Sequence, residues 1–251
     1  MSRPAPALRA AGALAALELR LTARRGENVL VTLIIPVAVL LFFAGTSVVP
    51  FAGDPAGFLL PGSIALGITA AGLVNLGIAT AYERSHGVLK RLGGSPLPRG
   101  GLVVAKLAAV LLLEVVQVVV LVAVGVLVLH WQPGAGWSPL LLIAAVLLGT
   151  FAFAGLGLLL AGTLRAEATL ALANGLFLAF LMLGGIVLPI DHLPSFIQPV
   201  ASVLPSAALA DLLRLALVSG PQPTSAMGPL LGLTAWGAAA AGLAIRRFRW
   251  D

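Results

Sequence analysis

The sequence predicts an all-α integral membrane protein, with six transmembrane helices in a single transmembrane domain over residues 1–251. Of these residues, 60% are hydrophobic and only 10% are charged, whereas a soluble domain carries about 25% charged residues. The hydrophobic residues are gathered in six blocks, each long enough to cross a bilayer as a helix. Basic residues fill the gaps between the blocks, which is typical of orientation signals and not of a nucleic-acid-binding face. We therefore expect membrane lipids around the chain and no nucleic-acid partner.

The six predicted spans are separated by short connections. Proline lies within the first block at position 36, near the start of the second at position 61, and at the first turn of the fourth at position 139. An interior proline kinks a helix, whereas a first-turn proline is well tolerated. The spans are expected at residues 29–49, 58–81, 102–129, 139–161, 168–188 and 227–245.

Residues 1–27 precede the first span and are predicted to be cytoplasmic. Leu14, Leu17 and Leu21 fall on one side of a helical wheel, beside Arg20 and Arg24. This pattern favours an amphipathic helix lying at the membrane surface. The alternative is a solvated tail.

The distribution of Lys and Arg predicts that both termini are cytoplasmic. With the N-terminus inside, 14 of the 15 basic residues fall on the cytoplasmic side and only Arg214 falls outside. Such a bias sets the orientation of membrane proteins, and we expect a multi-pass protein of the plasma membrane. The cytoplasmic set comprises Arg3, Arg9, Arg20, Arg24, Arg25, Arg84, Lys90, Arg91, Arg99, Lys106, Arg165, Arg246, Arg247 and Arg249.

A proline-rich segment, residues 189–223, lies between the fifth and sixth spans. Prolines at this spacing cut a helix into short pieces, and the apolar residues between them argue against a solvated loop. We predict a re-entrant hairpin in the outer leaflet, with Asp211 and Arg214 paired on the outer face of its last helix. The prolines meant here follow one another at steps of five, five and six residues: Pro189, Pro194, Pro199 and Pro205.

The residues needed for common catalytic and cofactor sites are not found together. The two lysines, Lys90 and Lys106, follow Leu89 and Ala105, so the chain has no Gly-Lys of a P-loop. There are no cysteines, and the three histidines are far apart in the sequence. We expect no nucleotide, metal or cofactor on this chain and no enzymatic activity of its own.

The basic loop, residues 82–101, is the longest predicted cytoplasmic connection. Its first part, 82–92, is predicted to form one short helix ended by Gly93 and the glycine after it. Such a helix would show Glu83, Arg84, Lys90 and Arg91 to the cytoplasm. From these residues alone, an orientation signal and a docking surface are equally good interpretations.

The order of two motifs resembles the permeases of type-2 ATP-binding cassette (ABC) exporters. The first is Glu83-Arg84-x-x-Gly87-x-Leu89-x-x-Leu92, followed by Ser-Pro-Leu-Pro at 95–98. In that family this loop holds the coupling helix, which docks on a separate ATPase subunit. The second is Gly184-Gly185-x-x-x-Pro189 with the prolines after it, which is similar to the family's outer re-entrant segment. Gly93 and Gly94 depart from the family pattern, where bulkier residues are common.

The resemblance implies a partner assembly and a set of coupling residues. Two copies of an ABC ATPase subunit would carry ATP and Mg²⁺, and a second permease subunit, as a homodimer, would complete the pathway. The coupling residues implied by the match are Glu83, Arg84, His86, Gly87, Leu89, Lys90 and Arg91.

Among the polar residues within the predicted spans, four are candidates for the substrate pathway: Asn75, Glu114, Gln117 and Asn174. A charge at the middle of a span costs about 2.5–3.5 kcal/mol on insertion scales. Glu114 could contact substrate or bind a proton, or, as we favour, be protonated in an interhelical hydrogen bond. For Asn75 and Asn174, pathway lining and ordinary interhelical bonding are equally good interpretations.

The expected function is ATP-driven export of a hydrophobic or amphiphilic substrate, drug-like or lipid. Within the same family, export of a lipid-linked glycan is the main alternative. A proton-coupled secondary transporter using Glu114, a lipid-modifying enzyme and a membrane anchor or sensor are weaker alternatives, because the spans hold few other ionisable residues.

Overall fold

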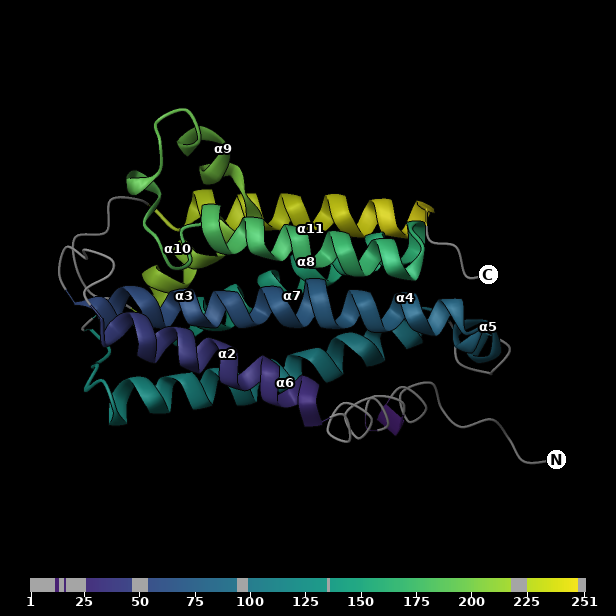
Figure 1. Ribbon diagram of the computed structural model, residues 1–251, viewed down its shortest axis with the longest axis horizontal. Coiled ribbons are helices and arrows are strands. Elements are labelled where there is room, and N and C mark those ends of the chain that lie inside the picture. The colour runs from purple at the N-terminus through teal and green to yellow at the C-terminus, as the bar shows by residue number, and fades with distance from the viewer. Residues whose placement is uncertain are drawn as a thin grey trace.

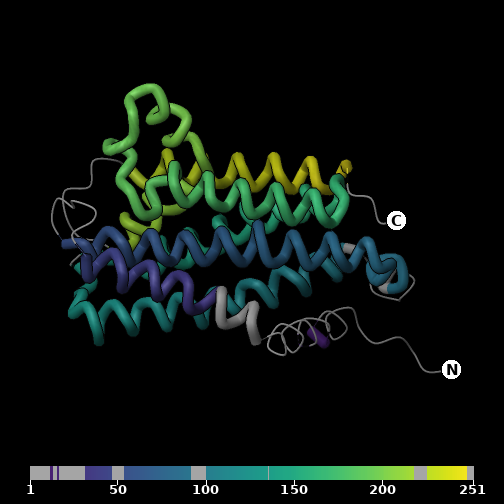
Figure 2. Tube along the Cα trace, viewed as in Figure 1, coloured from purple at the N-terminus to yellow at the C-terminus, as the bar shows by residue number. Residues whose placement is uncertain are grey.

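The computed structural model describes residues 12–13, 16, 26–46, 54–93, 99–134, 136–217 and 225–247, with only the backbone at 26–31, 92–93 and 99. These residues form helices, turns and bends, and no strand occurs among them. The long helices run along one common direction, from purple α2 to yellow α11 (Figure 1, Figure 2). The predicted all-α membrane fold is therefore confirmed. The predicted amphipathic helix within 1–27 lies almost entirely outside the described residues.

Five helices in the described part of the chain are long and apolar enough to cross a membrane. They are Pro55–Ser85, Gly100–Leu127, Pro139–Thr163, Ala166–Leu183 and Met227–Arg247. The first predicted span corresponds to α2, Gly26–Ala44, of which Thr32–Ala44 has described side chains and forms a shorter apolar helix. The sixth crossing thus stays a prediction that rests on α2.

The second predicted span is one continuous helical run of three parts. It consists of α3 (Pro55–Thr69), the π-helical η1 (Ala70–Leu76) and α4 (Gly77–Ser85). Asp54 caps its start, since its carboxylate accepts hydrogen bonds from the amides of Ala56 and Gly57, both at 3.0 Å. The run ends at Ser85, four residues beyond the boundary predicted at 81, so the first polar residues of the basic loop belong to this helix.

Helix α7 (Pro139–Thr163) lies at the centre of the bundle and packs against η1, α4, α10 and α11. Its close approach to η1 depends on glycines. A Cβ at Gly157 would lie 2.4 Å from the carbonyl oxygen of Gly72, and a Cβ at Gly72 would lie 2.7 Å from the amide nitrogen of Ala154. In lipid, where apolar surface gives little drive for helix association, such small residues allow close backbone packing.

Replacing Gly157 with alanine is expected to destabilise the protein by about 1–3 kcal/mol, because the new methyl group would overlap backbone atoms of η1. Gly175→Ala on α8 is the matched control, since a Cβ there meets no atom within 4 Å. SDS unfolding in mixed micelles, followed by tryptophan fluorescence, measures both. Equal stability of the two variants would contradict the packing described for α7 and η1.

The proline-rich segment forms short helices after α8 (Ala166–Leu183). These are η2 (Ile190–His192), α9 (Gln198–Val203) and α10 (Pro205–Leu217). Pro199 and Pro205 stand in the first turns of α9 and α10, where a missing amide hydrogen costs least. Helix α10 packs against α3, α7 and α11 before the chain enters α11 (Met227–Arg247), whereas α9 projects from the bundle (Figure 1).

Candidate functional site

The basic loop does not contain the single helix predicted over 82–92. Helix α4 ends at Ser85, the chain turns at His86 and Gly87, and a second helix, α5, runs over Val88–Gly93. Gly87 has a φ of 69°, a left-handed conformation that suits glycine. The amide of Gly87 donates to the carbonyl of Arg84 at 3.0 Å, which closes α4. The helix end predicted at Gly93 coincides with the last residue of α5.

Glu83 joins the basic loop to α6 (Arg99–Leu127) through an ion pair with Lys106. The Lys106 Nζ lies 2.7 Å from one carboxylate oxygen of Glu83 and 3.0 Å from the other. The Lys106 side chain is only 3% exposed, whereas that of Glu83 is 26% exposed. A carboxylate predicted to face the cytoplasm therefore points into the bundle and neutralises a buried lysine.

Arg84 joins the same loop to the turn between α7 and α8. Its Nη2 donates to the carbonyl oxygen of Leu164 at 2.6 Å, just beyond the last residue of α7. Beneath this bond, the buried residues Ala81, Ala161 and Ala166 pack together with Tyr82. Because Arg84 bonds a backbone carbonyl 80 positions away, the end of α4 and the α7–α8 turn are held together.

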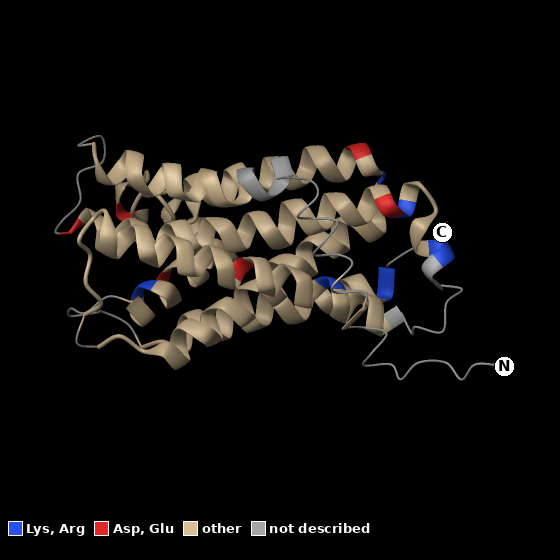
Figure 3. Cartoon of the chain, turned by 90° about the horizontal axis from the view of Figure 1, so that it is seen from below, with Lys and Arg blue, Asp and Glu red and all other residues tan. Residues whose placement is uncertain are grey.

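Apart from Gly87, which forms the turn, the predicted coupling residues divide into an inward and an outward group of three each. Leu89 is buried, at 1% exposure, and anchors α5, while Glu83 and Arg84 make the contacts described above. His86, Lys90 and Arg91 are exposed. Blue basic residues gather around this end of the bundle, near the C-terminus (Figure 3). The loop therefore exposes basic residues on one side, while Glu83, Arg84 and Leu89 attach it to the bundle on the other.

Sequence analysis did not identify Lys106 and Leu164 as partners of the loop. Lys106 could have been identified, because it lies among apolar residues near the start of the span predicted at 102–129. A lysine in that position needs a carboxylate partner. Leu164 contributes only its backbone oxygen, so no side-chain pattern could indicate it.

The four polar residues predicted for the pathway do not form one site. Asn75 donates from Nδ2 to the Thr32 hydroxyl at 2.8 Å, which links η1 to α2. Asn174 is exposed on α8 and bonds its own helix, at the carbonyl of Leu170. Glu114 and Gln117 are instead buried within the bundle.

Glu114 is enclosed between α6 and α7. The Thr150 hydroxyl is within hydrogen-bond distance of Glu114 Oε2 and, at 2.7 Å, of the carbonyl of Val146, and it donates its single hydrogen to one of these oxygens at a time. Glu114 Oε1 and Gln117 Nε2 are buried without a hydrogen-bond partner in the described part of the chain. Gln117 packs against Gly67 of α3, where even a single Cβ would overlap it. These contacts favour interhelical bonding over pathway lining for Glu114.

Replacing Glu114 with glutamine is expected to leave both stability and transport unchanged at every pH tested, because glutamine keeps the size and the acceptor for Thr150. Thr150→Val is the companion variant and should cost about 1 kcal/mol, since it removes the donor between the helices. Vesicle transport across a pH series checks the first, and SDS unfolding checks the second. A pH dependence that disappears only in Glu114→Gln would identify a proton-binding role instead.

At the opposite end of the bundle, Arg214 of α10 holds the proline-rich segment in place. The predicted pair of Asp211 and Arg214 is confirmed, but the Arg214 side chain is only 15% exposed and so does not lie on an outer face. Nη1 lies 3.3 Å from Asp211 Oδ1, Nη2 donates to the carbonyl of Gly185, and the guanidinium carbon lies 3.8 Å from the centre of the Phe58 ring. One cation thus connects α10, the chain after α8, and α3.

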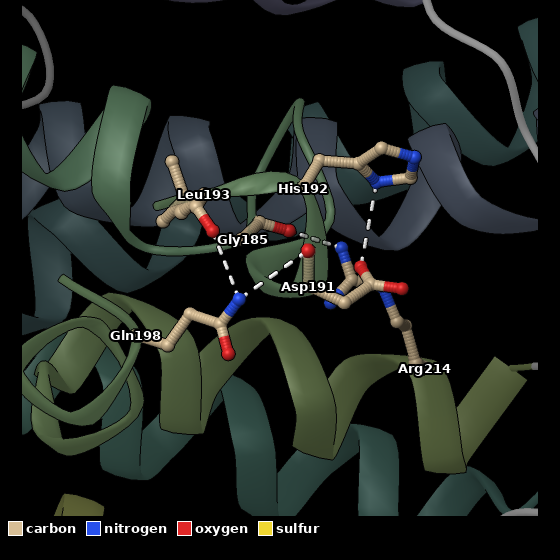
Figure 4. Close-up of polar contacts among 6 residues, drawn as sticks. All are labelled: Gly185, Asp191, His192, Leu193, Gln198 and Arg214. Carbon is tan, nitrogen blue, oxygen red and sulfur yellow. Dashed lines mark hydrogen bonds and ion pairs between the residues drawn. The ribbon is translucent and has the colours of Figure 1, made fainter. Parts of the chain in front are cut away.

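Three further contacts order the chain near this arginine (Figure 4). Gln198 donates to the carbonyls of Leu193 at 2.8 Å and Asp191 at 3.3 Å, which closes the loop between η2 and α9. The His192 Nδ1 lies 3.4 Å from Asp191 Oδ1. Pro189 and Pro194 flank this loop: Pro189 precedes η2, and the carbonyl of Pro194 accepts from the amide of Ile197 at 2.8 Å.

Comparison with known proteins identifies relatives whose names describe transport or drug resistance. The "Probable multidrug ABC transporter permease YbhS" of Escherichia coli K12 is 25% identical over 170 residues, which cover 66% of this chain and 44% of that protein. The "Linearmycin resistance permease protein LnrN" of Bacillus subtilis 168 is 33% identical over 108 residues, covering 41% of this chain and 28% of that protein. The "Probable multidrug ABC transporter permease YbhR" of E. coli K12 is 24% identical over 194 residues, covering 76% and 52% respectively. The matches thus span about half or less of each relative.

The family assignment rests on a longer match than any of these pairs. Residues 9–218 match the family described as ABC-2 type transporter, and they include both the basic loop and helix α10. Four of the five long apolar helices, the basic loop and α10 with Arg214 lie within this match, whereas α11 (Met227–Arg247) follows it. The chain is a multi-pass membrane protein and belongs to the ABC-2 type transporter family.

Proposed function

We propose that this chain is the membrane-spanning permease subunit of an ATP-driven ABC exporter, with ATP and Mg²⁺ bound by a separate ATPase subunit. The observation that carries the proposal is the construction of the basic loop. His86, Lys90 and Arg91 are exposed on it, while Glu83, Arg84 and Leu89 tie it to the bundle. A surface that only set orientation would not need these three inward contacts.

The inward contacts supply a route for mechanical coupling. A push on α5 would reach α6 through the pair Glu83–Lys106, and the α7–α8 turn through the bond from Arg84 to Leu164. Helix α8 begins at that turn, at Ala166. Displacement of the loop by an ATPase subunit would therefore tilt α8, which carries the exposed Asn174.

The assembly we propose contains two permease subunits, as a homodimer, and two ATPase copies. Helix α8 supports this, since it exposes a broad apolar face for a partner or lipid that includes Leu170, Leu172, Leu178 and Met182. We place the basic end of the bundle and both termini in the cytoplasm, and the chain in the plasma membrane. The bias of Lys and Arg toward one end supports that orientation (Figure 3).

The cargo we propose is hydrophobic or amphiphilic, either drug-like or lipid. The bundle is predominantly apolar, and two of the relatives are named for multidrug transport and one for linearmycin resistance. Export of a lipid-linked glycan by the same mechanism is the alternative that a transport assay would separate.

The test compares docking with coupling in the complete complex. The full chain is purified with an ABC ATPase subunit that co-purifies with it, and export of a fluorescent lipophilic dye is measured in vesicles. Lys90→Glu/Arg91→Glu should weaken ATPase binding by about tenfold, since it reverses two exposed charges. Arg84→Gln should keep the ATPase bound but lower dye export per ATP hydrolysed, because the bond to Leu164 is lost.

Arg165→Gln is the matched control, because it removes an exposed positive charge beside Leu164 without removing the Arg84 bond. It should behave like the parent protein. Dye movement that needs no ATPase subunit and follows a proton gradient would refute the proposal. Unchanged ATPase binding in the double charge reversal would refute the assigned docking surface.

A further inference from the structure

A cavity of about 460 Å³ lies at the basic end of the bundle, between α6, α7 and α11. Helix α7 packs against both of the other helices and lies between them (Figure 1), so it forms the floor. Gly155 and Leu158 belong to this floor, while Val103 lies on the α6 wall and Ala241 on the α11 wall. The volume is in the range of small-ligand sites, which is about 300–1,000 Å³.

The cavity opens on the lateral surface of the bundle. Phe151 of α7 and Ile245 of α11 both line it, and they are 40% and 83% exposed. Both belong to helices that are long and apolar enough to cross a membrane. The material that meets this opening in a bilayer is hydrocarbon, so an acyl chain is the occupant that the position favours.

The inner end of the cavity is polar. Thr80 lines it, although the Thr80 hydroxyl oxygen itself is buried away from the cavity. Lys106 also lines this end and is paired with Glu83.

The charge near the opening favours an anionic headgroup. Arg246 and Arg247 follow Ile245 directly, in the last turn of α11, and both are exposed. Basic side chains next to a membrane attract anionic lipids, each by about fivefold in affinity. A neutral or cationic amphiphile would gain nothing from these two residues.

We propose that this cavity binds one acyl chain of an anionic phospholipid, with the headgroup beside Arg246 and Arg247. The bound chain would contact Leu89, the buried anchor of α5, from below. Lipid occupancy would therefore support the basic loop at its anchor. This site is independent of the cargo and of the ATPase subunit.

The test uses the full chain in phosphatidylcholine nanodiscs that contain a small fraction of phosphatidylglycerol with a diazirine on one acyl chain. After photolysis, labelled residues are mapped by mass spectrometry. Labels should concentrate on 102–107 and 241–245, with a preference of about fivefold or more over a phosphatidylcholine carrying the same diazirine. Arg246→Gln/Arg247→Gln should remove that preference.

Two variants fill the cavity from opposite walls, Ala241→Phe and Val103→Phe, so that misfolding of one does not decide the result. Both should lower labelling in the cavity to the level of the exposed faces. Ala239→Phe, on the exposed part of α11, is the matched control and should leave the labelling unchanged.

Three results would overturn the proposal. One is labelling spread over the lateral surface in proportion to exposure, and another is equal labelling by the phosphatidylcholine probe. The third is efficient maleimide cross-linking of two copies through Ile245→Cys, because a second copy would then cover the opening. The natural chain has no cysteine, so that cross-link would be specific.

Discussion

Replacing Glu83 with alanine is expected to lower the free energy of unfolding by about 3 kcal/mol, the largest effect of any single change in the basic loop. The carboxylate that neutralises Lys106 would be lost, while the lysine stays 3% exposed within the bundle. Removing one member of a buried ion pair costs more than removing both, because the remaining charge stays in a medium of low polarity. SDS unfolding in mixed micelles, followed by tryptophan fluorescence, measures the loss.

The double variant Glu83→Ala/Lys106→Met tests the cause of this loss. It removes both charges and keeps an unbranched side chain in place of Lys106, so it should be more stable than Glu83→Ala alone. Lys90→Ala is the exposed control on the same loop and should change stability by no more than about 0.5 kcal/mol. A double variant less stable than the single one would show that Glu83 acts through some other contact.

Replacing Arg214 with alanine is expected to cost about 2–4 kcal/mol and to loosen the proline-rich segment. The carbonyl of Gly185 would lose a charged donor, Asp211 its ion-pair partner, and the ring of Phe58 its cation. These three losses affect α10, the chain after α8, and α3 together. Limited proteolysis between residues 184 and 204 and SDS unfolding measure the local and the global effect.

Two variants separate the contributions at Arg214. Asp211→Asn removes one charge but keeps an acceptor, and since Asp211 is half exposed, it should cost less than 1 kcal/mol. Arg214→Lys keeps the charge but cannot reach Asp211 and Gly185 at once, so it should restore only part of the stability. If lysine restored full stability, the planar geometry of the guanidinium would be irrelevant to this connection.

Most of the helices were predictable because lipid imposes simple requirements. A backbone in hydrocarbon must satisfy its own hydrogen bonds, so apolar blocks of sufficient length become helices. The first block also forms a helix, α2, in which Thr32–Ala44 is a shorter apolar helix with described side chains. The single helix predicted over 82–92 failed at Gly87, whose left-handed conformation ends α4 and redirects the chain.

The candidate site could be predicted only in part. The motif Glu83-Arg84-x-x-Gly87-x-Leu89 pointed to the loop, whose role in ATPase docking stays a prediction, but the helix expected there showed Glu83 and Arg84 to the cytoplasm. The structure turns both inward, toward Lys106 and the carbonyl of Leu164. The periodicity of one short helix cannot show which side chains turn inward. The partners lie in other parts of the sequence, Lys106 in α6 and Leu164 just after α7.

By itself, the sequence determined that lipid surrounds the chain, that the fold is all-α, and that basic residues gather between the apolar blocks. Each of these depends only on composition and on neighbours along the chain. Tertiary structure alone decided which polar groups meet: Glu83 with Lys106, Arg84 with Leu164, Glu114 with Thr150, and Arg214 with Gly185. The physical reason is that a polar group removed from water must find whichever partner the packing brings near it. That partner is fixed by how close neighbouring helices approach, which at Gly72 and Gly157 is set by the absence of a side chain.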